Sequence, residues 1–356
     1  MRSKISKGNG KSKRLIFILL IAVVTIIGIV LICIKFLSKS SESKNIDVKK
    51  PDDPVVEKQV QIIDINSKTR PYAVMINCLN EALPQSGLDK AYIVYELMVE
   101  YGITRMFALF KDVDFDKVGS VRSVRSQYLP YLFENDAILV HAGGQKETID
   151  RIANEGITHI DVDGQYGVRD GELAKKRAWE HTLFTNSNLL SKAVSNMNIR
   201  STTDTKNLLT YSASELDLSK YETKDAKNIS IKYSNYRTSN YSYDENSKTY
   251  LRSMNGTKNV DLVSGKQYQV KNIIVYGAKY TTYTLRGTGY QKIEDITSGE
   301  GYYITDGVVL PITWSKSSEK AQTVYKIKED GKELVVNDGN TYIQIYPSNG
   351  GNLSIS

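Results

Sequence analysis

The most uniform apolar stretch of the chain lies near its start. Residues 15–34 carry no charge, and only Thr25 and Gly28 interrupt an otherwise apolar series. At about 1.5 Å per residue, such a run is roughly 30 Å long as a helix, which is the thickness of a bilayer core. The pattern predicts a single transmembrane helix over 15–37, followed by a stalk over 38–68. A cleaved signal peptide is the alternative, since it also has basic residues before an apolar run.

From residue 69 onward, short apolar runs alternate with helical patterns. The runs are rich in Ile, Val, Tyr and Phe, as expected for strands that are buried on both faces. The expected strands are 72–77, 91–100, 103–111 and 137–141, and the expected helices are 127–134, 147–154 and 188–197. This alternation predicts an α/β layer domain over 69–212.

Beyond residue 226 the pattern becomes strand-like throughout. Apolar and polar residues alternate over 229–233, and further strand-like runs cover 271–276 and 302–314. Asp-Gly between such runs is a strong hairpin signal. It occurs at three places, which are Asp306-Gly307, Asp330-Gly331 and Asp338-Gly339. We therefore expect a mainly-β domain over 227–348, joined to the first domain by the polar segment 213–226.

The distribution of charge argues against a nucleic-acid partner. The net charge is +7, but six basic residues precede the apolar run, namely Arg2, Lys4, Lys7, Lys11, Lys13 and Arg14. Subtracting these six leaves +1 for the rest, whereas nucleic-acid-binding proteins carry their basic excess in the folded part. By the positive-inside rule, the basic tail 1–14 is expected in the cytoplasm and the domains outside the cell membrane.

The two cysteines predict neither a disulfide nor a lipid anchor. Cys33 lies within the apolar run and follows Ile32, whereas a lipidated cysteine after a signal peptide needs a small residue before it. Cys78 has no second cysteine to pair with in the outer part. Packed cores must therefore stabilise the domains.

Several motifs resemble one protein family. They are RPYAVMIN at 70–77, PQSGLDKA at 84–91, GITR at 102–105, GSVRSVR at 119–125, HAGG at 141–144, TYLRS at 249–253, VKNIIV at 270–275 and TWSK at 313–316. Over residues 68–348 the chain resembles the YerB-like family of Gram-positive surface lipoproteins, a two-part domain of unknown function. The resemblance implies a location at the cell surface and names no reaction. This chain departs from the family at Ile32-Cys33, so a membrane helix is expected in place of a lipid.

Polar residues gather at the ends of the apolar runs in the first domain. The candidate ligand-binding residues are Arg105, Arg122, Arg125, His141, Gly143, Gly144, Glu96 and Asp89. Ligands of α/β sheets bind at strand ends, and guanidinium groups suit carboxylate or phosphate. The alternative is that Glu96 forms an internal ion pair with one of the three arginines, or that Arg122 and Arg125 are solvated surface residues.

Enzyme chemistry has weaker support. A hydrolytic triad could be formed by Ser123 or Ser126 together with His141 and Asp136. The G-x-S-x-G turn that positions the serine in many hydrolases is absent, however. The three histidines are widely spaced, and no metal or cofactor is expected. We therefore expect a membrane-anchored extracytoplasmic surface protein of the cell envelope that binds an anionic or cell-wall-derived ligand, or an envelope protein. A cell-wall hydrolase using Ser/His/Asp or carboxylate chemistry is the alternative.

Overall fold

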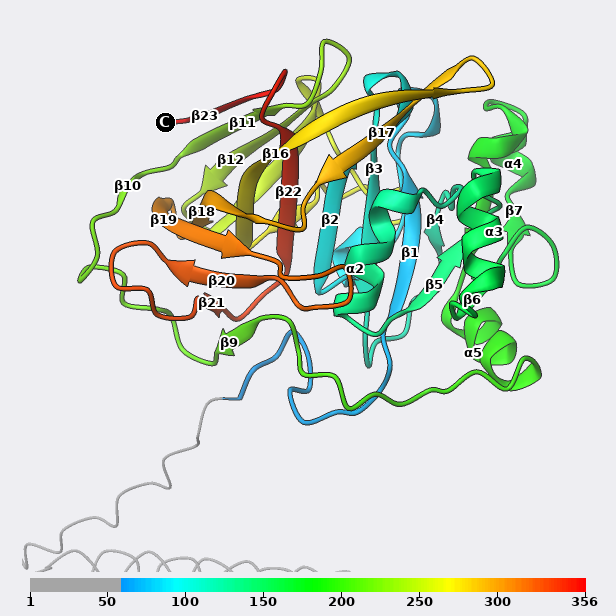
Figure 1. The fold of residues 1–356 in the computed structure, drawn as a ribbon, viewed down its shortest axis with the longest axis horizontal. Coiled ribbons are helices and arrows are strands. Elements are labelled where there is room, and N and C mark those ends of the chain that lie inside the picture. Colours follow the sequence, from blue (N-terminus) through cyan, green and yellow to red (C-terminus); the bar gives the residue numbers. More distant parts are fainter. Residues whose placement is uncertain (1–58) are drawn as a thin grey trace, which may run out of the picture. The chain divides into compact units, whose positions relative to one another are not determined.

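Strands from the beginning and the end of the described chain meet in one twelve-stranded sheet. The computed structural model describes residues 59–356, which fold as one compact unit (Figure 1). The main strand order is β10 (Lys224–Asp225), β19 (Val308–Ser315), β18 (Ser298–Thr305), β16 (Asn272–Leu285), β22 (Thr341–Pro347), β2 (Ile93–Met98), β3 (Thr104–Phe110), β1 (Tyr72–Asn77), β5 (Ile138–His141) and β6 (His159–Asp161). In addition, β17 (Thr288–Glu294) pairs with β16, and β20 (Val324–Ile327) pairs with β19. The parallel pairing of β2 with β22 joins strands that are about 250 positions apart in the sequence.

A second, six-stranded sheet covers one face of the large sheet. Its order is β14 (Thr257–Lys258), β13 (Thr249–Met254), β12 (Thr238–Asp244), β11 (Asn228–Lys232) and β23 (Asn352–Ile355), with β15 (Gln269–Val270) beside β13. Two small sheets complete the strands, one of β21 (Val335–Asn337) and β9 (Thr210–Ser212), the other of β4 (Val118–Gly119), β8 (Leu183–Thr185) and β7 (Val168–Arg169).

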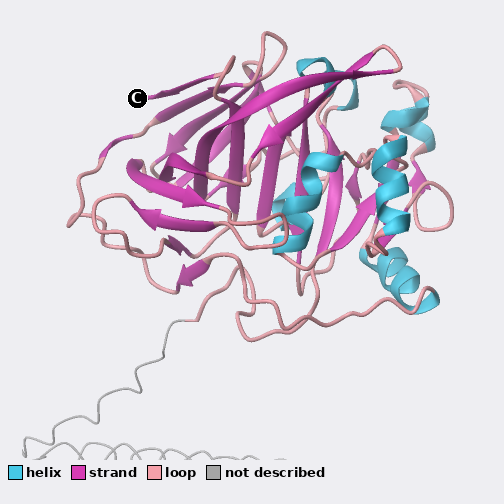
Figure 2. Ribbon diagram, in the orientation of Figure 1, coloured by secondary structure: helices cyan, strands magenta, loops and turns pink. Residues whose placement is uncertain are grey.

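The helices of the described part are few and short. They are α2 (Leu129–Glu134), α3 (Lys146–Asn154), α4 (Gly171–Ala174) and α5 (Ser187–Asn196), with 3-10 turns at 80–82, 88–90, 100–102, 126–128 and 179–181. The predicted fold class, an α/β layer domain followed by a mainly-β domain, is therefore wrong: both parts are mostly β (Figure 2). The predicted alternation of helices and strands fails because, among the described residues, only β5, α3 and β6 follow the parallel strand–helix–strand pattern. β2 and β3, by contrast, are antiparallel and are joined by a tight turn.

The fold class also included a transmembrane helix, and no finding supports it. Over residues 59–356 no helix is long and apolar enough to cross a bilayer, and the predicted helix at 15–37 lies outside the described residues.

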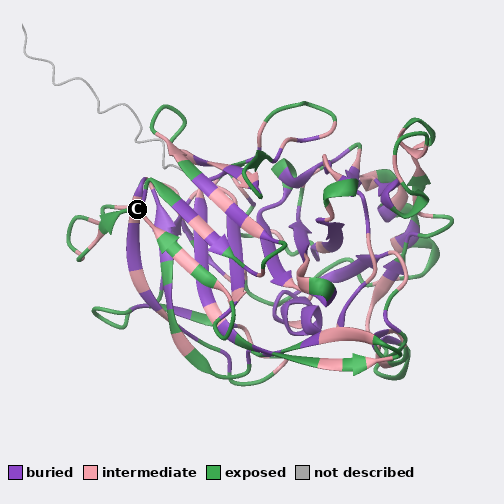
Figure 3. Cartoon of the chain, turned by 90° about the horizontal axis from the view of Figure 1, so that it is seen from above, coloured by how far each residue is buried: buried purple, intermediate pink, exposed green. Residues whose placement is uncertain are grey.

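Alternate residues of the central strands contribute to two different cores. On β1, Ala73 and Met75 belong to the core beneath α2, whereas Val74 and Ile76 face the second sheet and α5. This period of two explains why the central strands read as continuous apolar runs. Figure 3 shows the consequence, with buried residues concentrated on the central strands and exposed residues on the surrounding loops.

The three Asp-Gly pairs do not all form the hairpins that the sequence predicts. Asp306-Gly307 turns β18 into the antiparallel strand β19, as predicted. Asp330-Gly331 turns the chain after β20 toward a single bridge between Lys326 and Glu333. Asp338-Gly339 does not form a hairpin, because β21 before it pairs with β9 while β22 after it pairs with β2 and β16. The predicted joint at 213–226 stays a prediction.

Candidate functional site

The C-terminal ends of several strands meet along one edge of the large sheet. β1 and β5 run parallel, as do β5 and β6, and β2 has the same direction as β1 because both are antiparallel to β3. The segment 119–125 crosses this edge, bridging to Ile76 at the end of β1 and to Gly144 beyond the end of β5. We call this place the strand-end site.

The hairpin of β16 and β17 reaches over the strand-end site from the second half of the chain (Figure 1). Tyr290 on β17 lies 5.7 Å from the guanidinium of Arg125, measured to the ring centroid. The hydroxyl of Tyr101, just after β2, lies 3.2 Å from Thr288 Oγ1. Both halves of the chain therefore contribute residues to this edge.

Glu100 holds two of the three predicted arginines. Arg105 Nη2 donates to Glu100 Oε1 at 2.9 Å, and Arg125 Nε donates to Glu100 Oε2 at 2.9 Å. All three side chains are nearly buried. Burial raises the pKa of the Glu100 carboxyl, but the hydrogen bond from Arg125 and the charge of Arg105 outweigh burial and lower it overall. The trio is an internal ion network with one more positive than negative charge.

Arg122 adds a positive charge that no carboxylate neutralises directly. Within residues 59–356 its guanidinium has no ion pair or side-chain hydrogen bond, and its buried Nε has no partner. Burial lowers the pKa of Arg122, and Arg125 lowers it further, while Glu180 and Glu100 act in the opposite direction. Burial and the charge of Arg125 likewise lower the pKa of Arg105 to about 10. Arg105, Arg122 and Arg125 therefore lie close enough to repel one another.

A second group of side chains borders Arg122. Asn77, the last residue of β1, has its Nδ2 2.9 Å from Nδ1 of His181. Burial and the charge of Arg122 lower the pKa of His181. Trp179, two residues earlier, is 62% exposed, and the guanidinium of Arg169 lies 4.9 Å from its ring centroid. An exposed indole and an unpaired guanidinium thus occur on neighbouring segments.

His141 is next to the arginines but is already bonded on both sides. Its Nδ1 lies 2.7 Å from the carbonyl oxygen of Gly143, which can only accept a hydrogen bond, so Nδ1 is the donor. Its Nε2 lies 2.9 Å from Nδ1 of His159. A Cβ on Gly144 would lie 2.7 Å from Ile149 Cδ1 and 2.9 Å from Val124 Cγ1, so a larger residue there would have to displace these side chains. A Cβ on Gly143 would meet no neighbouring atom, but the backbone φ of +60° at this position favours glycine.

The predicted hydrolytic triad is not assembled. Asp136 precedes β5 and pairs with Arg200 at 2.8 Å, whereas His141 ends β5, about 16 Å away at about 3.3 Å per residue. Ser126 Oγ is 2.8 Å from Thr148 Oγ1. No hydrogen bond joins Ser123 or Ser126 to His141 among the described residues.

Glu96 lies away from the strand-end site, on the face covered by the second sheet. It pairs with Arg252 of β13 at 2.9 Å and accepts hydrogen bonds from Thr104 and Ser239. The alternative in which Glu96 pairs with Arg105, Arg122 or Arg125 is therefore wrong. β2 points this carboxylate to the opposite side of the sheet, and the sequence pattern did not indicate which strand would cover that side.

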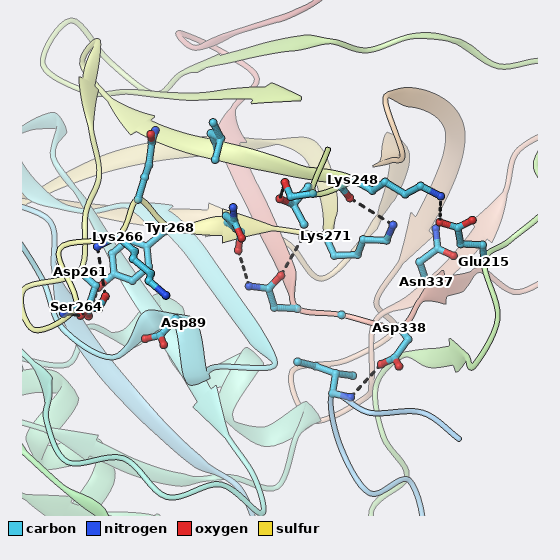
Figure 4. A pocket seen from close by; sticks show the side chains of 18 of the residues that line it. Asp89, Glu215, Lys248, Asp261, Ser264, Lys266, Tyr268, Lys271, Asn337 and Asp338 are labelled. Atoms are coloured by element: carbon cyan, nitrogen blue, oxygen red, sulfur yellow. Dashed lines mark hydrogen bonds and ion pairs between the residues drawn. The ribbon is translucent and has the colours of Figure 1, made fainter. Parts of the chain in front are cut away.

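Asp89 lies in a different place again, a large polar groove of about 1080 Å³ (Figure 4). Figure 4 shows Asp89, Asp261 and Lys266 toward one end of the groove and Lys248, Glu215 and Lys271 toward the other. Lys248 pairs with Glu215 at 2.5 Å, Lys271 pairs with Asp306, and Asp261 accepts from the Tyr268 hydroxyl at 3.0 Å. These charges neutralise one another, so the groove offers no net surplus of positive charge to an anion.

The structure thus brings six of the eight predicted residues to one edge and separates Glu96 and Asp89 from them. Their assignment as ligand-binding residues stays a prediction. The sequence analysis missed Glu100, although an acidic residue directly before the Gly102 turn could have signalled it. It also missed Trp179 and His181, because no periodic pattern marks residues 162–186.

Two family models match this chain. Residues 60–200 match the family described as "Protein of unknown function (DUF3048) N-terminal domain", and residues 229–343 match the corresponding C-terminal domain. A curated relative, "Putative lipoprotein YerB" of Bacillus subtilis, is 29% identical over 293 residues, which are 79% of this chain and 82% of the relative.

The fold has been seen before. The crystal structure of the YerB protein from Bacillus subtilis matches with a TM-score of 0.69 and 26% identity, covering 81% of this chain and 94% of that one. The motifs, the two family models and the shared fold agree, and the chain belongs to the YerB-like family of proteins of unknown function.

Proposed function

We propose that this protein is a membrane-associated surface protein that binds an anionic ligand of the cell wall at the strand-end site. The ligand's carboxylate or phosphate would be held by Arg122. Arg105 and Arg125 raise the local positive potential, and Glu100 fixes them in place.

The observation that carries this proposal is the unpaired guanidinium of Arg122. Arg105 and Arg125 already share Glu100, so the three arginines are left with an excess of two positive charges over that carboxylate. Like charges this close are tolerable only if an anion or solvent compensates them. A planar guanidinium with free donors suits bidentate binding of carboxylate or phosphate.

The surroundings of Arg122 favour a ligand larger than a free ion. Trp179 is a large exposed aromatic residue beside His181, and exposed aromatic residues are enriched at binding surfaces. A cell-wall polymer offers both an anionic group for Arg122 and a sugar or peptide portion for Trp179. The proposed location is supported by the curated relative, which is described as a putative lipoprotein.

Co-sedimentation with purified Gram-positive cell walls tests the proposal. The full-length protein should bind native walls, and binding should fall as salt is raised, because exposed charge interactions are screened. Walls whose phosphate-containing polymers have been removed chemically should bind less. Equal binding to both wall preparations at all salt concentrations would exclude an anionic ligand.

A further inference from the structure

Another cavity lies beside the β16–β17 hairpin, next to Ser126 and Gln127. It has a volume of about 410 Å³, is open to solvent on one side and lies between β17 and the start of α2. Pro130 of α2, Tyr283 of β16 and Ile293 of β17 form its apolar walls, and the half-exposed Ile296 lies at its rim. This volume is within the range of small-molecule sites, and apolar walls combined with polar and charged side chains can bind a ligand that has both kinds of group.

One polar group in this cavity lacks a partner. Asp295 is only 5% exposed, and its Oδ2 has no hydrogen bond. Burial raises the pKa of this carboxyl, and the hydroxyl of Tyr131 and the charge of Lys316 act in the opposite direction without cancelling the effect of burial. A buried carboxylate without a donor is costly, so such groups are normally paired.

The cations nearby do not pair with Asp295. Lys292 lines the cavity but is exposed and forms no ion pair with Asp295 among the described residues. Arg151 binds Glu319 through two hydrogen bonds of 2.7 Å and also pairs with Glu155. Lys316 donates to Glu134 Oε2 at 2.7 Å, with both side chains buried. Asp295 therefore has no counter-ion of its own among the described residues, and the cavity next to it is large enough for a ligand to provide one.

We propose that this cavity binds a small primary amine whose ammonium group pairs with Asp295 and whose apolar part packs on Pro130, Tyr283 and Ile293. This cavity borders the strand-end site at Ser126 and Gln127 but takes a ligand group of the opposite charge. It does not depend on the proposed binding of an anion by Arg122.

Titration calorimetry with two matched probes, benzylamine and benzyl alcohol, tests this inference on the full-length protein. Benzylamine should bind, and benzyl alcohol should bind about tenfold more weakly, because a charge-assisted hydrogen bond is about twice as strong as a neutral one. Asp295→Asn should bind both probes equally. Glu294→Gln, an exposed neighbour on the same hairpin that pairs with Lys279, is the matched control and should behave as wild type.

A second variant covers the case in which Asp295→Asn does not fold. Ile296→Trp places a bulky side chain at the exposed rim, where it is tolerated, and should weaken benzylamine binding by hindering entry. Wild-type protein that binds neither probe, or binds both equally, overturns the inference. So does an Asp295→Asn variant that still prefers benzylamine.

Discussion

Glu96 of β2 and Arg252 of β13 form an ion pair of 2.9 Å in which both side chains are fully buried. The pair joins the large sheet to the sheet that covers it. Thr104 and Ser239 donate to the carboxylate, and Asn259 accepts from Arg252 Nη1, so most polar atoms of the pair are satisfied. The pair therefore fixes how the two sheets are aligned.

Removing one member of this pair should be severely destabilising. Arg252→Ala leaves Glu96 buried and unpaired, and we expect a loss of about 3–5 kcal/mol in the free energy of unfolding. Urea denaturation measures this loss. The double variant Glu96→Leu/Arg252→Met should be milder, since replacing both members with apolar residues removes the unpaired charge. A single variant as stable as the wild type contradicts the role given to this pair.

Glu100 should make the protein sensitive to acid. Its pKa is lowered in the folded state, so its stabilising effect is complete above the pKa of about 4.3 in the unfolded chain and is lost at lower pH. Glu100→Gln should be less stable than wild type at pH 7, and the difference should shrink as the pH falls below about 4. Thermal unfolding across this pH range measures the difference. A constant difference would mean that Glu100 is not ionised in the folded protein.

His141 and His159, whose rings are stacked with their centroids 5.1 Å apart, should affect the stability of the protein at higher pH than Glu100 does. Burial lowers the pKa of both His141 and His159, so the unfolded chain takes up protons more readily. Their contribution to stability is therefore present above the unfolded pKa of about 6.5 and declines as the pH falls below it. Replacing the half-buried His159 with Gln should flatten the decline in melting temperature between pH 7 and 5. An unchanged slope would contradict the neutral hydrogen-bonded pair.

The sequence predicted local structure better than the way the strands associate. The runs at 72–77 and 137–141 are strands β1 and β5 almost to the residue, because apolar runs closed by Asn77 and by the Gly143-Gly144 turn have clear ends. The pairing of β2 with β22 was not predictable, since it joins residues that are about 250 positions apart and no local pattern records such a contact.

The candidate site, too, was predicted from local positions but not in its tertiary contacts. The clustering of Arg105, Arg122 and Arg125 followed from their positions at strand ends. Which carboxylate would neutralise them depended on the side of the sheet that each residue faces. Glu96 and Glu100 are four residues apart, yet one contacts the second sheet and the other the strand-end site. Residues four apart on one strand would face the same side, but Glu100 lies beyond the end of β2, in the turn 100–102, and the apolar pattern does not indicate where the strand ends.

Comparing Arg122→Ala with Arg125→Ala tests the central claim most directly, since only one of these arginines is free of a carboxylate. Both variants are measured for affinity to native cell walls and for melting temperature, with Arg200→Ala at the opposite end of β5 as the control. Arg122→Ala should lose wall binding while its melting temperature stays close to wild type. Arg125→Ala should lower the melting temperature, because Glu100 loses a buried partner. Wall binding that survives Arg122→Ala, or an Arg122→Ala variant destabilised as much as Arg125→Ala, would contradict the account.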